Sequence, residues 1–598
     1  MDKFKKNLSL LRSHDPALAR RVASTRPSDK IKTVTSRDGH PVPQVGSVSL
    51  HSVYRPIEEA VRLVSAHAFH EDLPDIVYGL GFGYHVRETL NRVSGSITVI
   101  EPCMEMFREF LAVVDLQPFL PRARFCIDEE PAKILARTGN SEKWNILEHV
   151  ASVRISQEYF ERLEKGRRLA DFLHSKRLKI LVVNPIYGGS LPTARFCSQA
   201  LENLGHQVRS VQCEKFADGF FSIKDITKVK QHAGVLSNLF MNLMGELTAA
   251  RAAEFQPDLI LALAQAPLTP AALERLKVLN IPIAFWFVED FRTLTYWKEI
   301  AASYDFIFAI QKGEFFEKLK SAGARNCYYL PQGGFPEIHK PLQLTPEEQK
   351  IYGAELSFMG AGYYNRKKTF PQLLKFDFKI WGTEWDLDSK IGERVQNNNC
   401  RVSTEESVKI YNGGQINLNL HSSTYHENIN PEGDFVNPRT FEIAACSAFQ
   451  LVDERSELDD VFRVGEEIVT FNSVPDLKEK IGYYFKHADE RKRIARKGYE
   501  RVLAEHTLEH RMMEMLIHIF LDQFETVKQR IEVRKEAVDY FMEQAGAETE
   551  LGRYLEQFRG TPNFSLKTVT DRIAGGKGAL TQTETLLLML NQLVKEEV

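Results

Sequence analysis

Residues 431–454, PEGDFVNPRTFEIAACSAFQLVDE, run from an acidic loop into a short helix and then directly into a strand. Asn437 is a favoured N-cap residue, and Pro438 suits the first helical position, where no backbone N–H is missed. The helix is therefore predicted to begin at Asn437, immediately after an irregular loop. The mostly apolar residues FQLV that follow are predicted to form a strand. This helix-to-strand step is one unit of an alternating α/β pattern.

The same alternation extends on both sides of this stretch. Short continuous apolar strands are separated by amphipathic helices in two blocks, residues 178–335 and 352–515. The predicted strands include LKILVV, LILALA, PIAFWFV and FIFAI in the first block, and ELSFMG, FKIWG, INLNLH and EIVTF in the second. Such strands indicate a parallel sheet covered on both faces. We therefore predict two consecutive doubly wound α/β domains with a cleft between them, joined by the Gly- and Pro-containing linker 332–353.

The rest of the chain falls into three parts. Residues 1–45 are polar and basic, and they fit a mobile lead-in and an ordered strand-and-turn extension equally well. Residues 46–170 contain a strand, a glycine loop, a helix and a further strand, which predicts a Rossmann-like α/β domain. Residues 516–598 are amphipathic at helical spacing, which predicts a helical tail that packs on the core by default, or on a partner.

Composition and charge exclude several classes of protein. The 598 residues are too many for one hydrophobic core, and a net charge of −3 gives no general attraction to nucleic acid or anionic lipid. The N-terminus lacks the apolar core of a signal peptide, and no apolar run approaches the ~20 residues that span a bilayer. Seven cysteines stand singly, which predicts neither a disulfide framework nor a zinc site. A cytoplasmic location is expected.

The start of the helix at Asn437 is a candidate phosphate site. Free N–H groups and the helix dipole favour an anion there, and Arg439 adds a forked positive charge. Glu442, about one turn further along the helix, is placed to reach a sugar or ribose hydroxyl next to that phosphate. Ligands of open α/β sheets bind in loops after the carboxyl ends of strands. The alternative, that Glu442 only complements the positive helix end, stays open on this stretch alone.

Other glycine turns also fit a nucleotide site. SFMGAGYYNRKK places Gly360 at a strand end, followed by Arg366 and Lys367 at a helix start; this suits a diphosphate, and a basic solvated helix start is the alternative. KIWG places Trp381 at another strand end, where it flanks a nucleobase or lies in the core. NPIYGGS in the first domain offers the backbone N–H groups of Gly188 and Gly189, although turns use glycine pairs widely.

Several of these stretches resemble a known family. NPRTFEIAACSAFQLVDERSELDDVF resembles the glycosyltransferase group 1 signature, and ADERKRIARKGYERVLAEHTLEHRMMEML resembles the C-terminal domain of the CgeB-type spore-maturation glycosyltransferases. PDLILALAQAP, PIAFWFVEDFR and YDFIFAIQKG resemble the N-terminal domain of the same family. The resemblance covers about residues 178–515. It implies a GT-B fold, in which two Rossmann-like domains hold a nucleotide-sugar in the cleft between them.

The family pattern implies roles for several residues. Retaining relatives carry an acidic residue, seven residues and then a glutamate, and Asp434 and Glu442 have this spacing, with Asp in place of the usual first Glu. By that pattern Glu442 holds the donor ribose, Asp434 lies near the donor sugar, and Arg366 and Lys367 pair with the diphosphate. The shorter side chain of Asp434 leaves its contact and a retaining outcome open.

Transfer of a sugar also requires an activated acceptor hydroxyl. Glu289 and Asp290, at the end of the AFWFV strand, are candidate general bases, against the alternative of ordinary charged residues at a strand end. His421, which ends INLNLH, is another cleft candidate, although a lone histidine there is more often structural. Asp386 and Asp388 in WDLDSK have the form of a metal-binding motif, but they lie in polar sequence beyond the strand and are rejected. Neither a metal nor another cofactor is expected, because cationic side chains and a helix N-terminus can stabilise the departing diphosphate.

The N-terminal α/β segment carries its own glycine loop. VYGLGFGYHVRETL places Gly79, Gly81 and Gly83 after a strand, and Glu101 ends the next strand, ITVIEP. A loop of this kind with an acid about 20 residues on suits S-adenosylmethionine or a dinucleotide. The segment also resembles the N-terminal region of motility-accessory-factor flagellin glycosyltransferases. We expect an accessory Rossmann-like domain without a ligand, with a methyltransferase as the alternative.

Three functions follow as hypotheses. The leading one is metal-independent transfer of a sugar from a nucleotide-sugar to a protein, flagellin being one candidate, or to a surface glycan. The second is an inactive GT-B fold that only binds partners, and donor turnover separates the two. The third is a bifunctional protein with methyl transfer in the N-terminal segment, which binding of S-adenosylmethionine tests. Donor, acceptor, stereochemistry and oligomeric state stay open.

Overall fold

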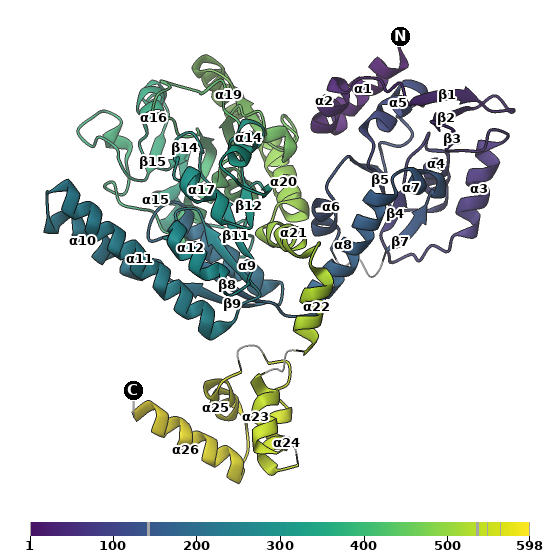
Figure 1. Cartoon of the computed structure of the whole chain (residues 1–598). Helices are drawn as coiled ribbons and strands as arrows, with labels where there is room; N and C mark the ends of the chain where they lie inside the picture. The colour runs from purple at the N-terminus through teal and green to yellow at the C-terminus, as the bar shows by residue number, and fades with distance from the viewer. Residues whose placement is uncertain (1, 140–143, 534–536, 547, 562–563, 597–598) are drawn as a thin grey trace.

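Three parallel sheets organise the chain, one in each of its α/β domains (Figure 1). The computed structural model describes residues 2–139, 144–533, 537–546, 548–561 and 564–596. Within these residues the two central sheets belong to the predicted pair of doubly wound domains. A further α/β domain precedes them and a group of helices follows, so the predicted fold class is confirmed.

The first doubly wound domain has a six-stranded sheet of order β13-β12-β11-β10-β8-β9, parallel throughout. Its strands are β8 (Lys179–Val183), β9 (Gln207–Val211), β10 (Leu259–Leu263), β11 (Ile283–Phe287), β12 (Phe306–Ala309) and β13 (Asn326–Tyr329). The main helices are α9 (Ser190–Asn203), α10 (Ala217–Ile226), α11 (Lys230–Phe255), α12 (Pro270–Lys277), α13 (Trp297–Ile300) and α14 (Glu314–Ser321). The central strands are uniformly apolar because helices cover both faces, and two clusters of buried side chains form the core.

The second doubly wound domain has a five-stranded parallel sheet of order β15-β14-β16-β17-β18. Its strands are β14 (Ala354–Met359), β15 (Phe378–Trp381), β16 (Gly414–Asn419), β17 (Gln450–Asp453) and β18 (Val469–Phe471). Its helices are α15 (Pro346–Tyr352), α16 (Tyr364–Thr369), α17 (Thr404–Gly413), α18 (Pro438–Ala445), α19 (Val474–Lys486) and α20 (Ala488–Glu505). In both domains the strand order reverses beside the first strand, which creates a crevice at the carboxyl ends of the strands.

The chain passes between these two domains twice, and the two crossing segments are hydrogen-bonded to each other. Gly334 N–H donates to His506 O, and Leu508 N–H donates to Gly334 O, both at 2.8 Å. The next helix, α21 (Leu508–Phe520), returns to the first domain and packs on α9. It also packs on α6 and α8 of the N-terminal domain, and thereby joins all three α/β domains.

The N-terminal domain has a four-stranded parallel sheet of order β6-β5-β4-β7. Its strands are β4 (Asp75–Tyr78), β5 (Ile97–Glu101), β6 (Ala123–Ile127) and β7 (Asn145–Glu148). Its helices are α3 (Pro56–Ala66), α4 (Tyr84–Arg92), α5 (Met104–Val113), α6 (Pro131–Thr138), α7 (Val150–Ile155) and α8 (Gln157–Ser175).

Residues 2–49 form an ordered extension, one of the two alternatives that the sequence left open for residues 1–45. They form α1 (Lys3–His14), α2 (Pro16–Ser24) and the antiparallel strands β1 (Ile31–Thr35), β2 (Pro41–Val45) and β3 (Val48–Ser49). Leu11, Leu18 and Val22 join the core of the N-terminal domain, so this extension is helical before it reaches the expected strands.

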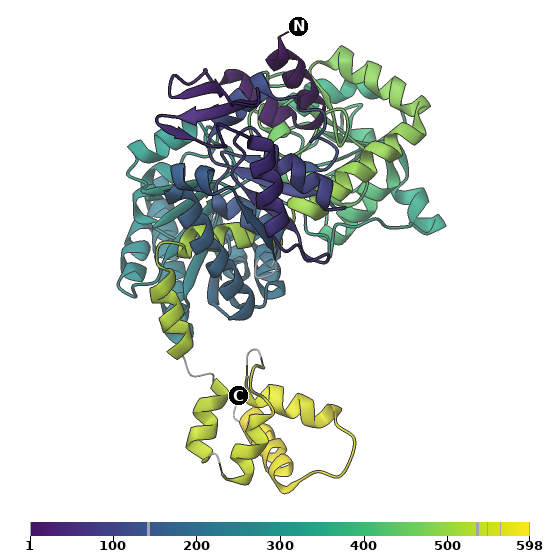
Figure 2. The ribbon, with the colours of Figure 1, turned by 90° about the vertical axis from the view of Figure 1, so that its right-hand side faces the viewer.

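The C-terminal helices form a separate group. α22 (Phe524–Val533) leads to α23 (Ala537–Ala545), α24 (Glu550–Glu556), α25 (Leu566–Gly575) and α26 (Gln582–Glu596). Val538, Leu555, Phe558 and Val569 contribute to a small core of their own. Figures 1 and 2 show this group apart from the α/β domains. The helices α23–α26 therefore pack on one another, whereas packing on the main core was the default expectation. Among the described residues, no helix combines the length and the apolarity needed to cross a membrane.

Candidate functional site

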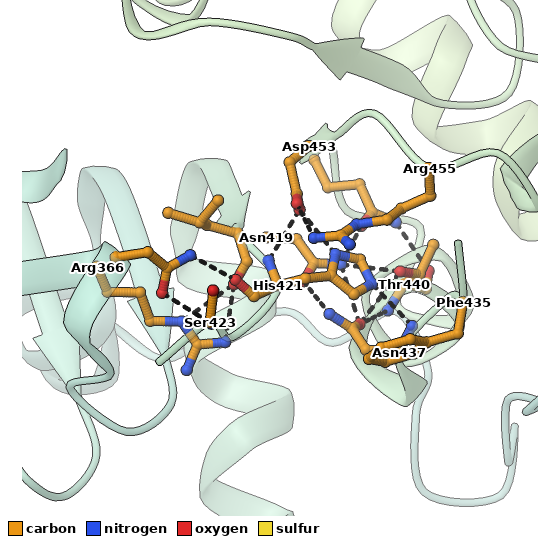
Figure 3. Close-up of polar contacts among 12 residues, drawn as sticks. Arg366, Asn419, His421, Ser423, Phe435, Asn437, Thr440, Asp453 and Arg455 are labelled. Carbon is orange, nitrogen blue, oxygen red and sulfur yellow. Dashed lines mark hydrogen bonds and ion pairs between the residues drawn. The ribbon is translucent and has the colours of Figure 1, made fainter. Parts of the chain in front are cut away.

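A buried hydrogen-bond network fixes the N-terminus of α18 (Figure 3). As predicted, Asn437 is the N-cap residue, and its Oδ1 accepts from Thr440 N–H at 3.1 Å. Asn437 Nδ2 donates to Asn419 Oδ1 at 2.8 Å, and Asn419 Nδ2 donates to Thr440 Oγ1 at 2.9 Å. The end of β16 therefore holds the helix start in place, and the Asn437 side chain serves the helix cap rather than a ligand.

His421 belongs to the same network. Its Nε2 accepts from Asn437 N–H at 2.9 Å, so Nδ1 carries the proton and donates to Asp453 at 2.7 Å. Burial, followed by repulsion from Arg455, lowers the pKa of His421 to about 4. Burial raises the pKa of Asp453, but Arg455 and His421 outweigh it and hold that pKa well below its usual range. His421 is thus a neutral positioning residue with both ring nitrogens engaged, which corrects its assignment to ligand binding.

Two arginines lie against one aromatic ring where the phosphate site was predicted. Arg366 and Arg439 both lie over the ring of Phe358, with Cζ atoms 4.9 and 5.6 Å from the ring centroid. Arg439 Nη1 is buried and finds no hydrogen-bond partner in the part of the chain that the structure describes. Burial, followed by repulsion from Arg439, lowers the pKa of Arg366 well below its usual range. The start of α18 thus holds two neighbouring positive charges and one unused buried donor.

Arg366 differs from its prediction as an open diphosphate ligand. Its side chain is 1% exposed; Nε and Nη2 donate to Leu420 O at 3.0 and 2.8 Å, and Nη1 donates to Ala361 O at 2.8 Å. These bonds tie the glycine turn after β14 to the end of β16. The neighbouring Lys367 is exposed at the start of α16, so Lys367 and Arg439 are the more accessible cations.

The predicted turn at Gly360 packs tightly against the turn after β15. A Cβ at Gly382 would stand 2.3 Å from Gly360 O, which only glycine avoids. Gly360 N–H donates to Trp381 O at 2.8 Å, and Trp385 Nε1 donates to Gly360 O at 3.0 Å. Trp381 is 1% exposed and lies near Tyr352. The Trp381 ring therefore lies in the core, which is one of its two predicted places. It offers no face to a nucleobase in this structure.

Glu442 lies inside α18, as predicted, and is half-buried. Its Oε2 accepts from the hydroxyl of the buried Tyr411 at 2.8 Å. Burial, followed by the charge of Glu442, raises the pKa of Tyr411 well above its usual range, so the hydroxyl stays protonated and donates. One carboxylate oxygen is thereby fixed, and a carboxylate accepts through both of its oxygens. Nothing in the sequence around Tyr411 indicated this contact.

Asp434 reaches across to the first domain. Its Oδ1 accepts from Gln311 Nε2 and its Oδ2 from Arg292 Nη1, both at 2.9 Å. Gln311 Nε2 also donates to Asp290 Oδ1 at 3.3 Å, so the structure brings two of the three predicted catalytic carboxylates together. Sequence reasoning missed Arg292 and Gln311, although both follow the carboxyl ends of strands, where ligands of such sheets bind.

Glu289 is the candidate general base with the more suitable acidity. Burial, followed by repulsion from Asp290, raises the pKa of Glu289 to about 7, and a base with such a pKa exchanges protons near neutrality. Asp290 accepts from Arg292 N–H, Thr293 Oγ1 and Gln311 Nε2 at 3.1–3.3 Å. Asp290 therefore orients the neighbouring groups, and Glu289 is the stronger candidate for proton transfer.

The loop after β8 contacts the second domain. Gly188 has φ +110°, and a Cβ there would stand 2.2 Å from Gln265 Oε1. Its carbonyl accepts from Arg401 Nη2 of the second domain at 2.6 Å. Gly189 follows at the start of α9. This loop is therefore a part of the boundary between the domains, and phosphate binding by its N–H groups stays a prediction.

The rejected motif WDLDSK forms a turn. Asp388 N–H donates to Asp386 Oδ1 at 3.2 Å, and the next strand of the sheet, β16, begins well beyond it. The Asp386 carboxylate thus serves local turn structure.

The glycine loop of the N-terminal domain is closed by side chains of the chain itself. Gly79 and Gly81 have φ +85° and +50°. A Cβ at Gly79 would stand 2.2 Å from Ser152 Cβ, and one at Gly81 would stand 2.5 Å from His51 Nε2. The space that a bound cofactor takes in related loops is therefore filled here.

Glu101 serves the same loop. It is buried, and it accepts from Leu80 N–H at 2.9 Å and from Cys103 N–H at 3.0 Å. Burial raises the pKa of Glu101 to about 7. A carboxyl group that binds the loop is not presented to a ribose, which favours the accessory domain over the methyltransferase.

Comparison with known proteins agrees with this geometry. The family described as "Glycosyl transferase-like" matches residues 366–517. The chain is 28% identical to the spore protein CgeB of Bacillus subtilis (strain 168) over 268 residues, which are 43% of this chain and 80% of that protein. The whole length of sucrose-phosphate synthase from Thermosynechococcus elongatus aligns with 60% of this chain, with a TM-score of 0.40 and 13% identity.

The whole length of the Anabaena protein HepE, in its complex with UDP-glucose, aligns with 59% of this chain, with a TM-score of 0.39 and 12% identity. The match covers β16, β17 and α18, and α18 carries both Arg439 and Glu442. Residues 366–517 thus match the glycosyl transferase-like family, and over 268 residues the chain is similar to the spore protein CgeB.

Proposed function

We propose that this chain transfers a sugar from a nucleotide-sugar donor to an acceptor hydroxyl without a bound metal. The observation that carries the proposal is the buried, unpartnered Nη1 of Arg439, next to the charge of Arg366 at the N-terminus of α18. A donor diphosphate supplies the acceptor oxygens and negative charge that this arrangement lacks among the described residues. The same groups stabilise the nucleoside diphosphate as it leaves, which is the part that a metal plays elsewhere.

The other residues fit the remaining parts of the reaction. Glu442, fixed by Tyr411, accepts from a ribose hydroxyl of the donor. Glu289 takes the proton of the acceptor hydroxyl while the oxygen of that hydroxyl forms a bond to the anomeric carbon of the donor sugar. The bond from that carbon to the diphosphate oxygen breaks, and the electron pair stays on the diphosphate beside Arg439. Asp434 lies near the donor sugar in this proposal and exchanges its bonds to the first domain for bonds to the substrate.

For the acceptor we propose a protein, with flagellin as first candidate, or a surface glycan. The resemblance of the N-terminal segment to flagellin glycosyltransferases supports this choice. In the described residues 75–101, moreover, the glycine loop is filled by side chains and leaves no open site for a cofactor. The helices α23–α26, which form a body of their own, supply an additional surface for such an acceptor.

Donor binding and turnover test the proposal directly. The full chain is mixed with UDP-, GDP-, ADP-, CMP- and dTDP-sugars, with and without EDTA, and its melting temperature is recorded. Release of nucleoside diphosphate is then measured with flagellin or surface glycan added. One donor class should raise the melting temperature and turn over in EDTA. Binding without turnover would instead favour the inactive partner-binding protein, and turnover abolished by EDTA would contradict metal independence.

A further inference from the structure

Three buried histidines of the N-terminal domain take no part in the proposed reaction. His51 follows β3, His85 lies on α4 and His149 precedes α7, and their exposed fractions are 4%, 1% and 6%. One nitrogen atom of each ring lies within 4.8 Å of a nitrogen of both others. Three imidazoles from three separate segments thus converge beside the glycine loop.

The hydrogen bonds show which nitrogens carry lone pairs. His85 Nε2 lies 2.9 Å from Gly79 O, and a carbonyl only accepts, so Nε2 carries the proton. His85 Nδ1 therefore has a lone pair, and this buried atom finds no partner among the described residues. His149 bonds in the same way to the backbone of Leu50, and its Nδ1 lies 2.7 Å from Ser152 Oγ. Metal-ligating histidines are usually held by such a bond from the far N–H to a carbonyl.

We propose that His51, His85 and His149 bind one divalent transition-metal ion, with Zn²⁺ the best match to three imidazoles. A water molecule completes the coordination. Because the three residues come from separate segments, the ion ties the segment after β3 and the start of α7 to the glycine loop.

Binding requires two local changes, and both are measurable. The rings of His85 and His149 are parallel within 11°, with centroids 4.3 Å apart, and a lone pair lies in the ring plane. One ring must therefore turn before both nitrogens reach the ~2.1 Å of a Zn–N bond. The hydroxyl of Ser152 can rotate away, which leaves His149 free to turn. His51 Nε2, which accepts from Phe82 N–H at 3.0 Å, exchanges that bond for the ion.

The test uses the full chain without an affinity tag, stripped with a chelator and titrated with Zn²⁺ and with Co²⁺. One equivalent of each should bind, Co²⁺ should give visible absorption bands of a four-coordinate site, and Zn²⁺ should raise the melting temperature. His85→Ala and His149→Ala should abolish all three effects. His70→Ala, in the exposed segment of the same domain, should retain them.

Two further measurements separate the metal site from a merely structural cluster. Ser152→Ala keeps all three ligands and should bind the metal at least as well as the unaltered chain, even if the histidine variants fold poorly. Hydrogen exchange at the Phe82 amide should become faster when Zn²⁺ is added. The proposal is overturned if the unaltered chain takes up no stoichiometric Zn²⁺ or Co²⁺, or if uptake persists in His85→Ala. Because this site lies outside the donor cleft, its test does not depend on the proposed transfer reaction.

Discussion

Replacing Arg439 with methionine should weaken donor binding and leave the fold intact. Nη1 of Arg439 has no partner among the described residues, and in the proposed reaction the donor diphosphate completes its bonding. A hydrogen bond to a charged group contributes ~1.5–3 kcal/mol, and its loss weakens the affinity ~10- to 150-fold.

The effect of the same substitution on stability should have the opposite sign. Methionine keeps an unbranched apolar stem against Phe358, where the Arg439 guanidinium lies 5.6 Å from the ring centroid. It removes a buried donor without a partner, and it removes the repulsion that lowers the pKa of Arg366. The melting temperature of Arg439→Met should therefore equal or exceed that of the unaltered chain.

Calorimetric titration with the nucleotide-sugar that shifts the melting temperature gives the affinity, and a thermal scan gives the stability. Lys368→Met is the matched control, because Lys368 lies exposed on α16 and the substitution removes the same charge from the same domain. The control should bind the donor as the unaltered chain does. Unchanged affinity in Arg439→Met would refute the diphosphate contact. A melting temperature several degrees lower would show that Arg439 is structural.

Three further substitutions test other parts of the site. Glu289→Gln should reduce turnover ~10²- to 10⁴-fold. The unaltered chain should show a rise in kcat/KM as pH increases through about 7, where Glu289 loses its proton, and Glu289→Gln should remove that rise. Tyr411→Phe should weaken donor binding only ~2- to 10-fold, because it removes one neutral donor from Glu442, and calorimetry with the same donor checks this. His421→Phe should lower the stability by about 2–4 kcal/mol in urea unfolding, since it breaks the bonds to Asn437 N–H and Asp453. The pKa of His421 is lowered to about 4, so its neutral ring stabilises the fold above pH ~6.5; that stability is lost as pH falls toward 4, which melting curves at several pH values would detect.

Local sequence patterns predicted the fold correctly where the structure of a segment depends mainly on its own residues. Continuous apolar runs such as β10 (Leu259–Leu263) have no polar face, so they fit only strands covered on both sides. Asn437 and Pro438 fixed the start of α18 to the residue. The polar lead-in was ambiguous because only a few apolar residues, such as Leu11 and Val22, anchor it, and their partners lie in α5.

The place of the candidate residues in the fold was predictable, but their contacts were not. The sequence places Arg366, Arg439 and Glu442 after strand ends, and the structure brings the two arginines together over Phe358. Whether a cation stays accessible depends on distant backbone, and Arg366 is buried because the carbonyl of Leu420 accepts from it. No local pattern carries that information. The same holds for His421, whose second partner, Asp453, belongs to the neighbouring strand β17.

The two doubly wound domains each carry a feature that reduces the stability of the folded chain. On one side, Arg366 and Arg439 repel each other and a buried donor stays unpaired among the described residues. On the other side, a half-buried carboxyl group, Glu289, stands next to Asp290 and has its pKa raised to about 7. A protein that only binds partners would gain stability by losing either feature, because unpaired buried charges destabilise a fold. Keeping both is what an anionic leaving group and a proton acceptor require on opposite sides of one substrate. The inactive-scaffold hypothesis therefore predicts that Arg439→Met and Glu289→Gln stabilise the chain with no loss of function, and the enzyme hypothesis predicts that each does so only with loss of donor binding or turnover.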